Sequence, residues 1–169
     1  SLKLRVACLS GVKESDLESL FNPIPFNPGA SELLLALQNR GWKTALVSGG
    51  FTWFADKVQK ALKLDAVLAN RLEVVNGCLT GKVLGSIVDA KMKAQQLEIL
   101  ADKWNIPRER TVAVGDGAND APMLETAAIG IAYNAKPALQ AVADYSINSN
   151  SLLEIIPCLQ HSKLIDPGV

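Results

Sequence analysis

The sequence predicts an α/β fold with a parallel sheet and a β-hairpin insertion. From about residue 31, segments with helical spacing of apolar residues alternate with short apolar segments typical of buried strands. Such alternation favours a parallel sheet with helices on both faces, which is a Rossmann-like three-layer core. An Asn-Gly pair at 76–77, between two strand-like segments, predicts the hairpin.

Each element follows from its apolar spacing and from the residues that end it. A helix is expected over 32–40, because Ser31 can cap its start and Gly41 can end it. Thr52–Leu62 repeats apolar residues every four positions and is also expected to be helical. The remaining predicted strands are 43–48, 65–69, 71–75, 79–84, 110–114, 129–132 and 145–147, and the remaining helices are 91–104, 120–127, 137–142 and 151–159.

The first 24 residues differ in pattern from the rest of the chain. They predict two short amphipathic helices broken near Gly11, with no strand before the first. We therefore expect a small helical piece over 1–24 and an α/β core over 25–169.

Composition excludes several classes of protein. The chain of 169 residues is 49% hydrophobic and 20% charged, which is enough apolar content for a core. Its net charge of zero and 5% aromatic content disfavour a nucleic-acid partner. No apolar run approaches the roughly 20 residues of a membrane span, so no membrane partner is expected. Three widely spaced cysteines, without a CxxC pair, predict reduced and mostly buried thiols in a cytoplasmic protein.

The segment TVAVGDGANDAPML carries the strongest signal for a site. Its apolar strand brings Asp116 to the carboxyl end, and Gly115 and Gly117 permit a sharp turn. Asn119 and Asp120 then begin a helix. Two carboxylates four residues apart suit Mg²⁺, which prefers oxygen ligands. The alternative is a plain strand-to-helix turn in which Asn119 or Asp120 only caps the helix, but the complete hexapeptide GDGAND favours the cation site.

The segment LVSGGF also stands at a strand end before a helix. Ser48 offers a hydroxyl, and Gly49 and Gly50 are expected to leave their N–H groups unobstructed. The helix beginning at Thr52 directs the positive end of its dipole the same way, which predicts a phosphate-binding loop. Ligands of parallel sheets bind beyond the carboxyl ends of the strands, where both motifs are predicted to lie.

Together, VSGGF and GDGAND resemble the phosphoserine phosphatase family of the haloacid dehalogenase-like superfamily. The likeness runs nearly end to end and includes SLKLRV, the hairpin LEVVNGCLTGKV and AYNAKP. It implies a three-layer core with part of a small helical cap at 1–24. It also implies Mg²⁺-dependent hydrolysis of a small phosphomonoester, O-phospho-L-serine, to L-serine and phosphate in serine biosynthesis, and it leaves a homodimer open.

The resemblance also implies roles for individual residues in phosphate binding. Ser48 matches the hydroxyl that hydrogen-bonds the transferring phosphoryl group, and Gly49 contributes a backbone contact. Lys93 matches the lysine that neutralises phosphate charge, with Lys91 as the alternative. Lys93 and Asp116 are the catalytic residues that the resemblance implies in this chain.

The remaining implied roles concern the cation and the substrate. Asp116 matches the Mg²⁺ ligand, Asp120 the carboxylate that supports the metal shell, and Asn119 a polar contact near the phosphate. Arg5 matches the cap arginine that grips the substrate carboxylate with a planar, two-pronged donor. Without the resemblance, Arg5 would be interpreted as part of a solvated helix face.

One expected motif is missing. The family's reaction begins at a D-x-D-x-T segment, whose first Asp attacks phosphorus and whose second acts as acid and base. The nine aspartates stand at positions 16, 56, 65, 89, 102, 116, 120, 144 and 166, and no two have D-x-D spacing. We therefore expect a segment of a longer phosphatase, beginning inside the cap. The nucleophile and the central strand, between 43–47 and 111–114, would lie upstream, and this chain alone would be inactive.

Two alternative functions remain open. A catalytically dead relative would bind phosphate or phosphoserine without turnover. The phosphorylation domain of a P-type cation pump also carries GDGxNDAP. In such a pump the second motif would begin with threonine and membrane helices would lie nearby, whereas this chain has SGGF.

Overall fold

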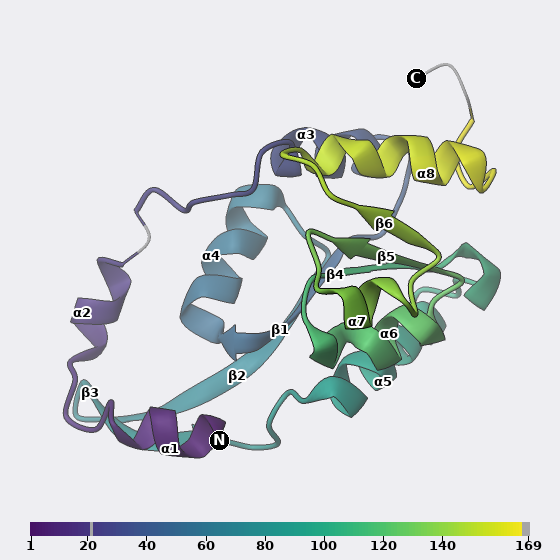
Figure 1. Ribbon diagram of the computed structural model, residues 1–169. Coiled ribbons are helices and arrows are strands. Elements are labelled where there is room, and N and C mark those ends of the chain that lie inside the picture. The colour runs from purple at the N-terminus through teal and green to yellow at the C-terminus, as the bar shows by residue number, and fades with distance from the viewer. Residues whose placement is uncertain (21, 167–169) are drawn as a thin grey trace. The chain divides into compact units, whose positions relative to one another are not determined.

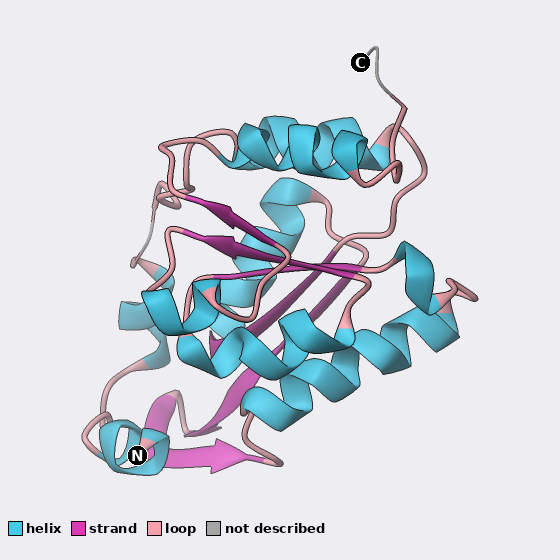
Figure 2. Ribbon diagram, turned by 45° about the vertical axis from the view of Figure 1, so that its right-hand side comes forward, coloured by secondary structure: helices cyan, strands magenta, loops and turns pink. Residues whose placement is uncertain are grey.

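The computed structural model describes residues 1–20 and 22–166 (Figures 1 and 2). Its helices are α1 Leu2–Ala7, α2 Glu14–Glu18, α3 Ala30–Gln38, α4 Thr52–Leu62, α5 Ala90–Lys103, α6 Ala121–Thr126, α7 Pro137–Gln140 and α8 Ile155–His161. Its strands are β1 Ala45–Phe51, β2 Ala66–Val75, β3 Cys78–Leu84, β4 Val112–Gly115, β5 Ile129–Tyr133 and β6 Tyr145–Ile147. Short 3₁₀ helices cover 108–110, 118–120 and 152–154. The chain forms two compact units, Ser1–Pro25 with Gly41–Val88, and Phe26–Arg40 with Asp89–Val169.

The first unit contains a three-stranded sheet in the order β1-β2-β3. Strand β1 pairs parallel with β2, and β2 pairs antiparallel with β3. Asn76 and Gly77 join β2 to β3 with φ angles of 50° and 73°. These left-handed conformations are what a two-residue hairpin turn requires, so the hairpin prediction is confirmed.

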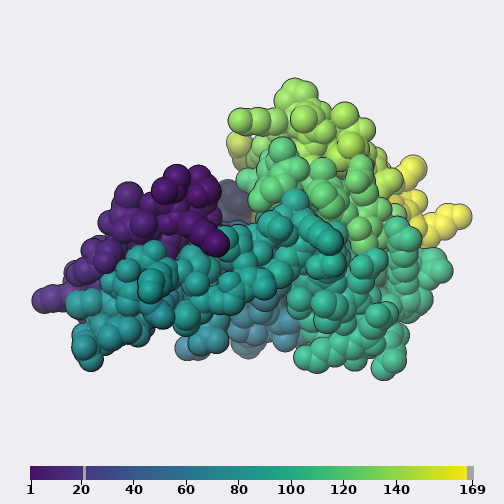
Figure 3. Space-filling view, turned by 90° about the horizontal axis from the view of Figure 1, so that it is seen from below, coloured from purple at the N-terminus to yellow at the C-terminus, as the bar shows by residue number. Residues whose placement is uncertain are grey.

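Helix α1 covers the hairpin of the first unit. Its Val6 is 1% exposed and packs in one cluster with Leu72 of β2 and Leu79 of β3. Figure 3 shows α1, in purple, lying on the surface of the hairpin. The two short helices predicted before residue 24 are confirmed, and their apolar faces pack on the β2–β3 hairpin.

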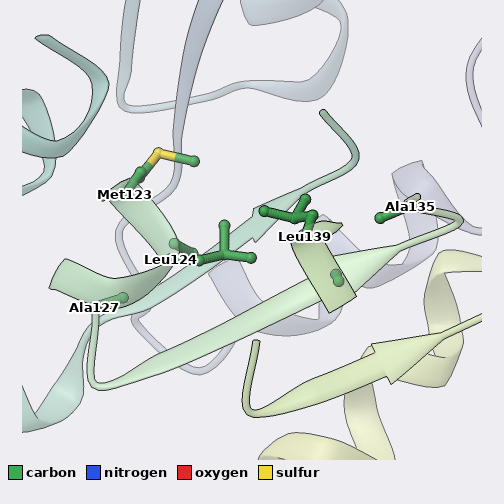
Figure 4. Close-up of a cluster of buried hydrophobic side chains, with 7 residues drawn as sticks. Met123, Leu124, Ala127, Ala135 and Leu139 are labelled. Carbon is green, nitrogen blue, oxygen red and sulfur yellow. The ribbon is translucent and has the colours of Figure 1, made fainter. Parts of the chain in front are cut away.

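The second unit contains a parallel sheet in the order β4-β5-β6. Its core lies where α6 and α7 meet the strands, and Figure 4 shows Leu124 of α6 and Leu139 of α7 over this sheet. The buried members are Ala113, Met123, Leu124, Ala127, Ala132, Ala135 and Leu139. Small alanines on β4 and β5 let the leucines approach the strands closely.

The structure confirms the α/β class with parallel strands and a hairpin, and it corrects several element boundaries. Helix α4 and strand β6 have the predicted bounds. The two strands predicted at 65–69 and 71–75 form one continuous strand, β2. The described strands pair as two three-stranded sheets. The three-layer arrangement and the domain boundary near residue 24 stay predictions.

The start of the first predicted helix is also corrected. Helix α3 begins at Ala30 with Gly29 as its N-cap, so the prediction of Ser31 as the cap was wrong. Gly29 has φ of 80°, and a Cβ there would stand 2.5 Å from Ser151 Oγ. Glycine is therefore favoured by the left-handed backbone conformation and by close packing against residues far along the chain.

All three cysteines are free, as predicted, but their predicted burial was wrong. Cys8 is exposed, and Cys78 and Cys158 are half-buried. Burial raises the pKa of the Cys158 thiol, which keeps that thiol protonated. Among the described residues, no helix has the length and apolar character needed to cross a bilayer.

Asp65 ties the start of β2 to the residues before β1. Its carboxylate accepts hydrogen bonds from the Thr44 backbone N–H at 2.8 Å and from Lys43 Nζ at 2.8 Å. Burial alone would raise the pKa of this carboxyl, but these hydrogen bonds and the Lys43 charge outweigh it and hold the pKa below 3.8. The ionised carboxylate therefore stabilises the fold above about pH 3.8, and this contribution is lost as pH falls through the folded pKa.

We expect Asp65→Asn to lower the free energy of unfolding by about 0.5–1 kcal/mol at pH 7, because the Lys43–Asp65 pair is partly exposed and asparagine can still accept the Thr44 N–H. Urea unfolding between pH 2 and 7 should also show a weaker acid dependence for this variant. Asp56→Asn, at an exposed position on α4, is the control. Equal acid dependence for Asp65→Asn and the wild type would contradict the assignment.

Candidate active site

The GDGAND turn presents one exposed carboxylate and one buried carboxylate. Strand β4 ends at Gly115, Asp116 follows as an exposed residue, and a 3₁₀ turn over 118–120 leads into α6. Asp120 is 5% exposed. The two aspartates that the sequence grouped together therefore have different environments.

Both oxygens of Asp120 are occupied by protein donors. Its Oδ1 lies 2.6 Å from Lys93 Nζ. Its Oδ2 accepts the backbone N–H groups of Asp116 at 3.2 Å and Gly117 at 3.1 Å. Asp120 thus links α5 to the turn and holds the backbone that presents Asp116.

Lys93, rather than the alternative Lys91, has a partner in this site. Lys93 is 7% exposed in the first turns of α5, which Asp89 caps by accepting the N–H of Met92 at 2.8 Å. Lys91 is exposed. A buried ammonium needs a charged partner, and the Asp120 carboxylate supplies it.

The residues of the turn fit a cation that keeps much of its water. Asp116 offers an exposed carboxylate, whereas the oxygens of Asp120 are held by Lys93 and by backbone N–H groups. Within residues 1–20 and 22–166 there is no group of three or more His, Cys, Asp or Glu that could hold a metal ion. Mg²⁺ is commonly bound through one or two carboxylates with water and phosphate oxygens as the other ligands. Asp116 meets that requirement, and Asp120 supports it from behind.

Gly115 is required by the approach of Asp120 rather than by its backbone conformation. A Cβ at Gly115 would stand 2.5 Å from Asp120 Cβ and 2.8 Å from Oδ2. The Asp120 side chain cannot move aside without giving up its contacts to Lys93 and to the turn. The predicted sharp turn is present, and close packing is the reason for this glycine.

We expect Gly115→Ala to lower the free energy of unfolding by about 1–3 kcal/mol, because the added methyl group overpacks the turn. Urea unfolding measures this loss. Ala118→Gly, at an exposed position of the same turn, is the control and should cost no more than about 1 kcal/mol. If Gly115→Ala were as stable as the wild type, the Asp120 side chain would have to be able to move away from the added methyl group.

The SGGF motif lies inside β1 and not after it. Pairing of β1 with β2 is interrupted between Val47 and Phe51, so Ser48–Gly50 form a loop within the strand. Ser48 Oγ accepts the N–H of Gly50 at 3.0 Å. The expectation of an unobstructed N–H at Gly50 was therefore wrong, because this N–H already has a local acceptor.

Asn70 contacts this loop and was not among the predicted site residues. Its Nδ2 donates to the carbonyl oxygen of Gly49 at 2.8 Å. The available signal was an amide side chain within an apolar strand-like segment, where a buried polar group needs a partner.

The predicted site residues fall into three places. Lys93, Asp116, Asn119 and Asp120 share α5 and the GDGAND turn of the second unit, where Asn119 is exposed. Ser48 and Gly49 share the loop of β1 in the first unit. Arg5 is exposed in the last turn of α1. Its contact with a substrate carboxylate stays a prediction.

Comparisons with known proteins agree with the motifs. A profile of the haloacid dehalogenase-like hydrolase family matches residues 2–125. The chain is 74% identical over 169 residues to a phosphoserine phosphatase of Idiomarina loihiensis, covering 100% of this chain and 77% of that protein.

Solved structures give the same picture. A probable phosphoserine phosphatase from Vibrio cholerae, unliganded, matches with a TM-score of 0.91 and 41% identity over 97% of this chain. A substrate-bound phosphoserine phosphatase complex matches with a TM-score of 0.88 and 41% identity, covering 93% of this chain and 75% of that one. The chain spans 50% of the V. cholerae protein.

Proposed function

Because this chain belongs to the haloacid dehalogenase-like hydrolase family, within the group of its phosphoserine phosphatase relatives, we propose that it is part of an Mg²⁺-dependent enzyme that hydrolyses O-phospho-L-serine to L-serine and phosphate. The carrying observation is the buried Lys93–Asp120 pair, which holds the turn that presents Asp116. The proposed substrate is phosphoserine because the relatives are phosphoserine phosphatases. The proposed reaction takes place in the cytoplasm.

The residues of this chain bind and orient the phosphoryl group. The Ser48 hydroxyl donates to a phosphoryl oxygen, and the backbone of Gly49 adds a second contact. The Lys93 ammonium and the Asn119 amide offset the charge that builds up on the phosphoryl oxygens. Mg²⁺ held by Asp116 would supply further positive charge near the phosphoryl group.

The nucleophile is proposed to lie outside these 169 residues, as does the aspartate that acts as acid and base. No D-x-D pair occurs in the sequence. Two strand edges also support this proposal. Among the described residues, β1 pairs only with β2 and β4 only with β5. A further strand would satisfy such edges.

Phosphate release from O-phospho-L-serine with Mg²⁺ tests this function. We expect none from the 169-residue chain, and turnover from a chimera that joins it to the part of the I. loihiensis relative outside the match. Turnover by the chain alone, with contaminating phosphatase excluded, would overturn the assignment of the nucleophile. A folded chimera that binds inorganic phosphate but releases none would favour a non-catalytic binding protein.

Arg5 gives a separate test of the substrate. We expect Arg5→Ala in the chimera to lower kcat/KM for O-phospho-L-serine by roughly 10- to 100-fold, because a charged hydrogen bond to the carboxylate is lost. O-phosphoethanolamine lacks that carboxylate, so its kcat/KM should stay within about twofold. Lys3→Ala, on the same helix, is the control. Equal losses with both substrates would remove Arg5 from carboxylate recognition.

A further inference from the structure

Asn70 is the most buried polar residue among those that the structure describes. It is 1% exposed, and both ends of its carboxamide are paired. Nδ2 donates to the Gly49 carbonyl at 2.8 Å, and Oδ1 accepts the Val88 backbone N–H at 2.8 Å. These partners also fix which end of the amide is nitrogen, because one partner is an acceptor and the other a donor.

The interruption in the β1–β2 pairing explains why an amide is needed there. Val47 pairs with Leu68 and Phe51 with Asn70, so the three residues Ser48–Gly50 stand opposite Ala69 alone. The regular ladder cannot supply a donor to each carbonyl of such a loop. The Asn70 side chain supplies the donor to Gly49 that the backbone of β2 does not.

The other end of the amide holds a second segment against the same loop. Val88 is 5% exposed, and its carbonyl oxygen would lie 3.7 Å from a Cβ placed on Gly49. Asn70 therefore joins the loop to residue 88 through one rigid, planar group. An apolar residue of similar size would fill the space but leave a buried carbonyl and a buried N–H without partners.

We propose that Asn70 is a positioning residue that fixes the Ser48–Gly50 loop in the conformation that binds the phosphoryl group. The proposal rests on the proposed function, since it assigns a ligand to that loop. Asn70 acts through the Gly49 backbone and not by touching substrate, because its side chain is enclosed by protein. The Gly49 carbonyl and the Gly50 N–H belong to the same peptide group, and that N–H donates to Ser48 Oγ. Releasing the carbonyl therefore also loosens the hold on the Ser48 hydroxyl.

A double-mutant cycle in the chimera tests this coupling, with inorganic phosphate as the competitive inhibitor. We expect Asn70→Ala and Ser48→Ala each to raise the inhibition constant about tenfold, and the double variant to raise it by clearly less than the roughly hundredfold of independent effects. A roughly hundredfold rise in the double variant would show independent effects and overturn the proposal. Leu72→Ala, elsewhere on β2, is the control for general destabilisation and should leave the constant within about twofold.

Amide hydrogen exchange keeps the test decisive if the proposed function fails or a variant folds poorly. Asn70→Asp keeps an acceptor for Val88 N–H, and its ionised form has no donor for Gly49. Exchange is compared with the wild type at several pH values, because burial favours the protonated carboxyl. We expect faster exchange at Gly50 in this variant, with Val88 still protected. Wild-type exchange at Gly50 would overturn the positioning role. If the wild type neither binds inorganic phosphate nor turns over, but Gly50 exchange responds to Asn70, the proposed function fails and the positioning of the loop does not.

Discussion

Replacing Asp120 by asparagine is expected to lower the free energy of unfolding by about 3–5 kcal/mol, because Lys93 would remain buried without its charge partner. Counting side-chain atoms alone, Asp120 is 7% exposed and Lys93 is 9% exposed, and Lys93 Nζ lies 2.6 Å from Asp120 Oδ1. Asparagine can still accept the backbone N–H groups of the turn, so the loss comes mainly from the unpaired ammonium. Urea unfolding measures the loss, and turnover of the chimera should fall as Lys93 loses its orientation.

A double variant separates charge from shape at this position. Lys93→Met with Asp120→Asn removes both charges, and it should recover most of the stability lost by Asp120→Asn without recovering turnover. Asp102→Asn, at an exposed position of α5, is the matched control for removing one carboxylate. Stability of Asp120→Asn within about 1 kcal/mol of the wild type would mean that Lys93 reaches water when its partner is removed.

Elements with local signals could be predicted from the sequence. The hairpin depends on Asn76 and Gly77, whose left-handed backbone conformations these residue types favour without help from distant contacts. Helix α4 depends on apolar spacing within eleven residues, and its predicted bounds are confirmed. The GDGAND turn follows from its own six residues in the same way.

Features that depend on distant contacts could not be predicted. Strand β2 runs on through Asn70, where the apolar pattern breaks, because Gly49 and Val88 supply the amide with partners. Helix α3 takes Gly29 rather than Ser31 as its N-cap, and Ser151 packs against that glycine. The same holds for Asp120, since its pairing with Lys93 joins residues 27 positions apart. Each case turns on a contact that neither local propensity nor spacing encodes.

Asp116→Asn is expected to abolish most turnover while leaving stability unchanged. Its side chain is exposed, and its backbone N–H already donates to Asp120, so the fold does not need the carboxylate. Loss of the anionic ligand should lower the turnover of the chimera by at least about 100-fold at a fixed Mg²⁺ concentration. The difference from Asp120→Asn is the informative point. One variant should lose activity with stability intact, and the other should lose both.

Cation binding is the measurement that links the loss to Asp116 itself. Titration calorimetry with Mg²⁺ should show weaker binding for Asp116→Asn than for the wild type, because a neutral amide replaces the carboxylate. Glu125→Gln, an exposed carboxylate on α6 close in sequence to the turn, is the control and should bind Mg²⁺ as the wild type does. Unchanged Mg²⁺ binding in Asp116→Asn would mean that the cation is held elsewhere. The GDGAND turn would then act on phosphate only through Asn119 and through the support that Asp120 gives to Lys93.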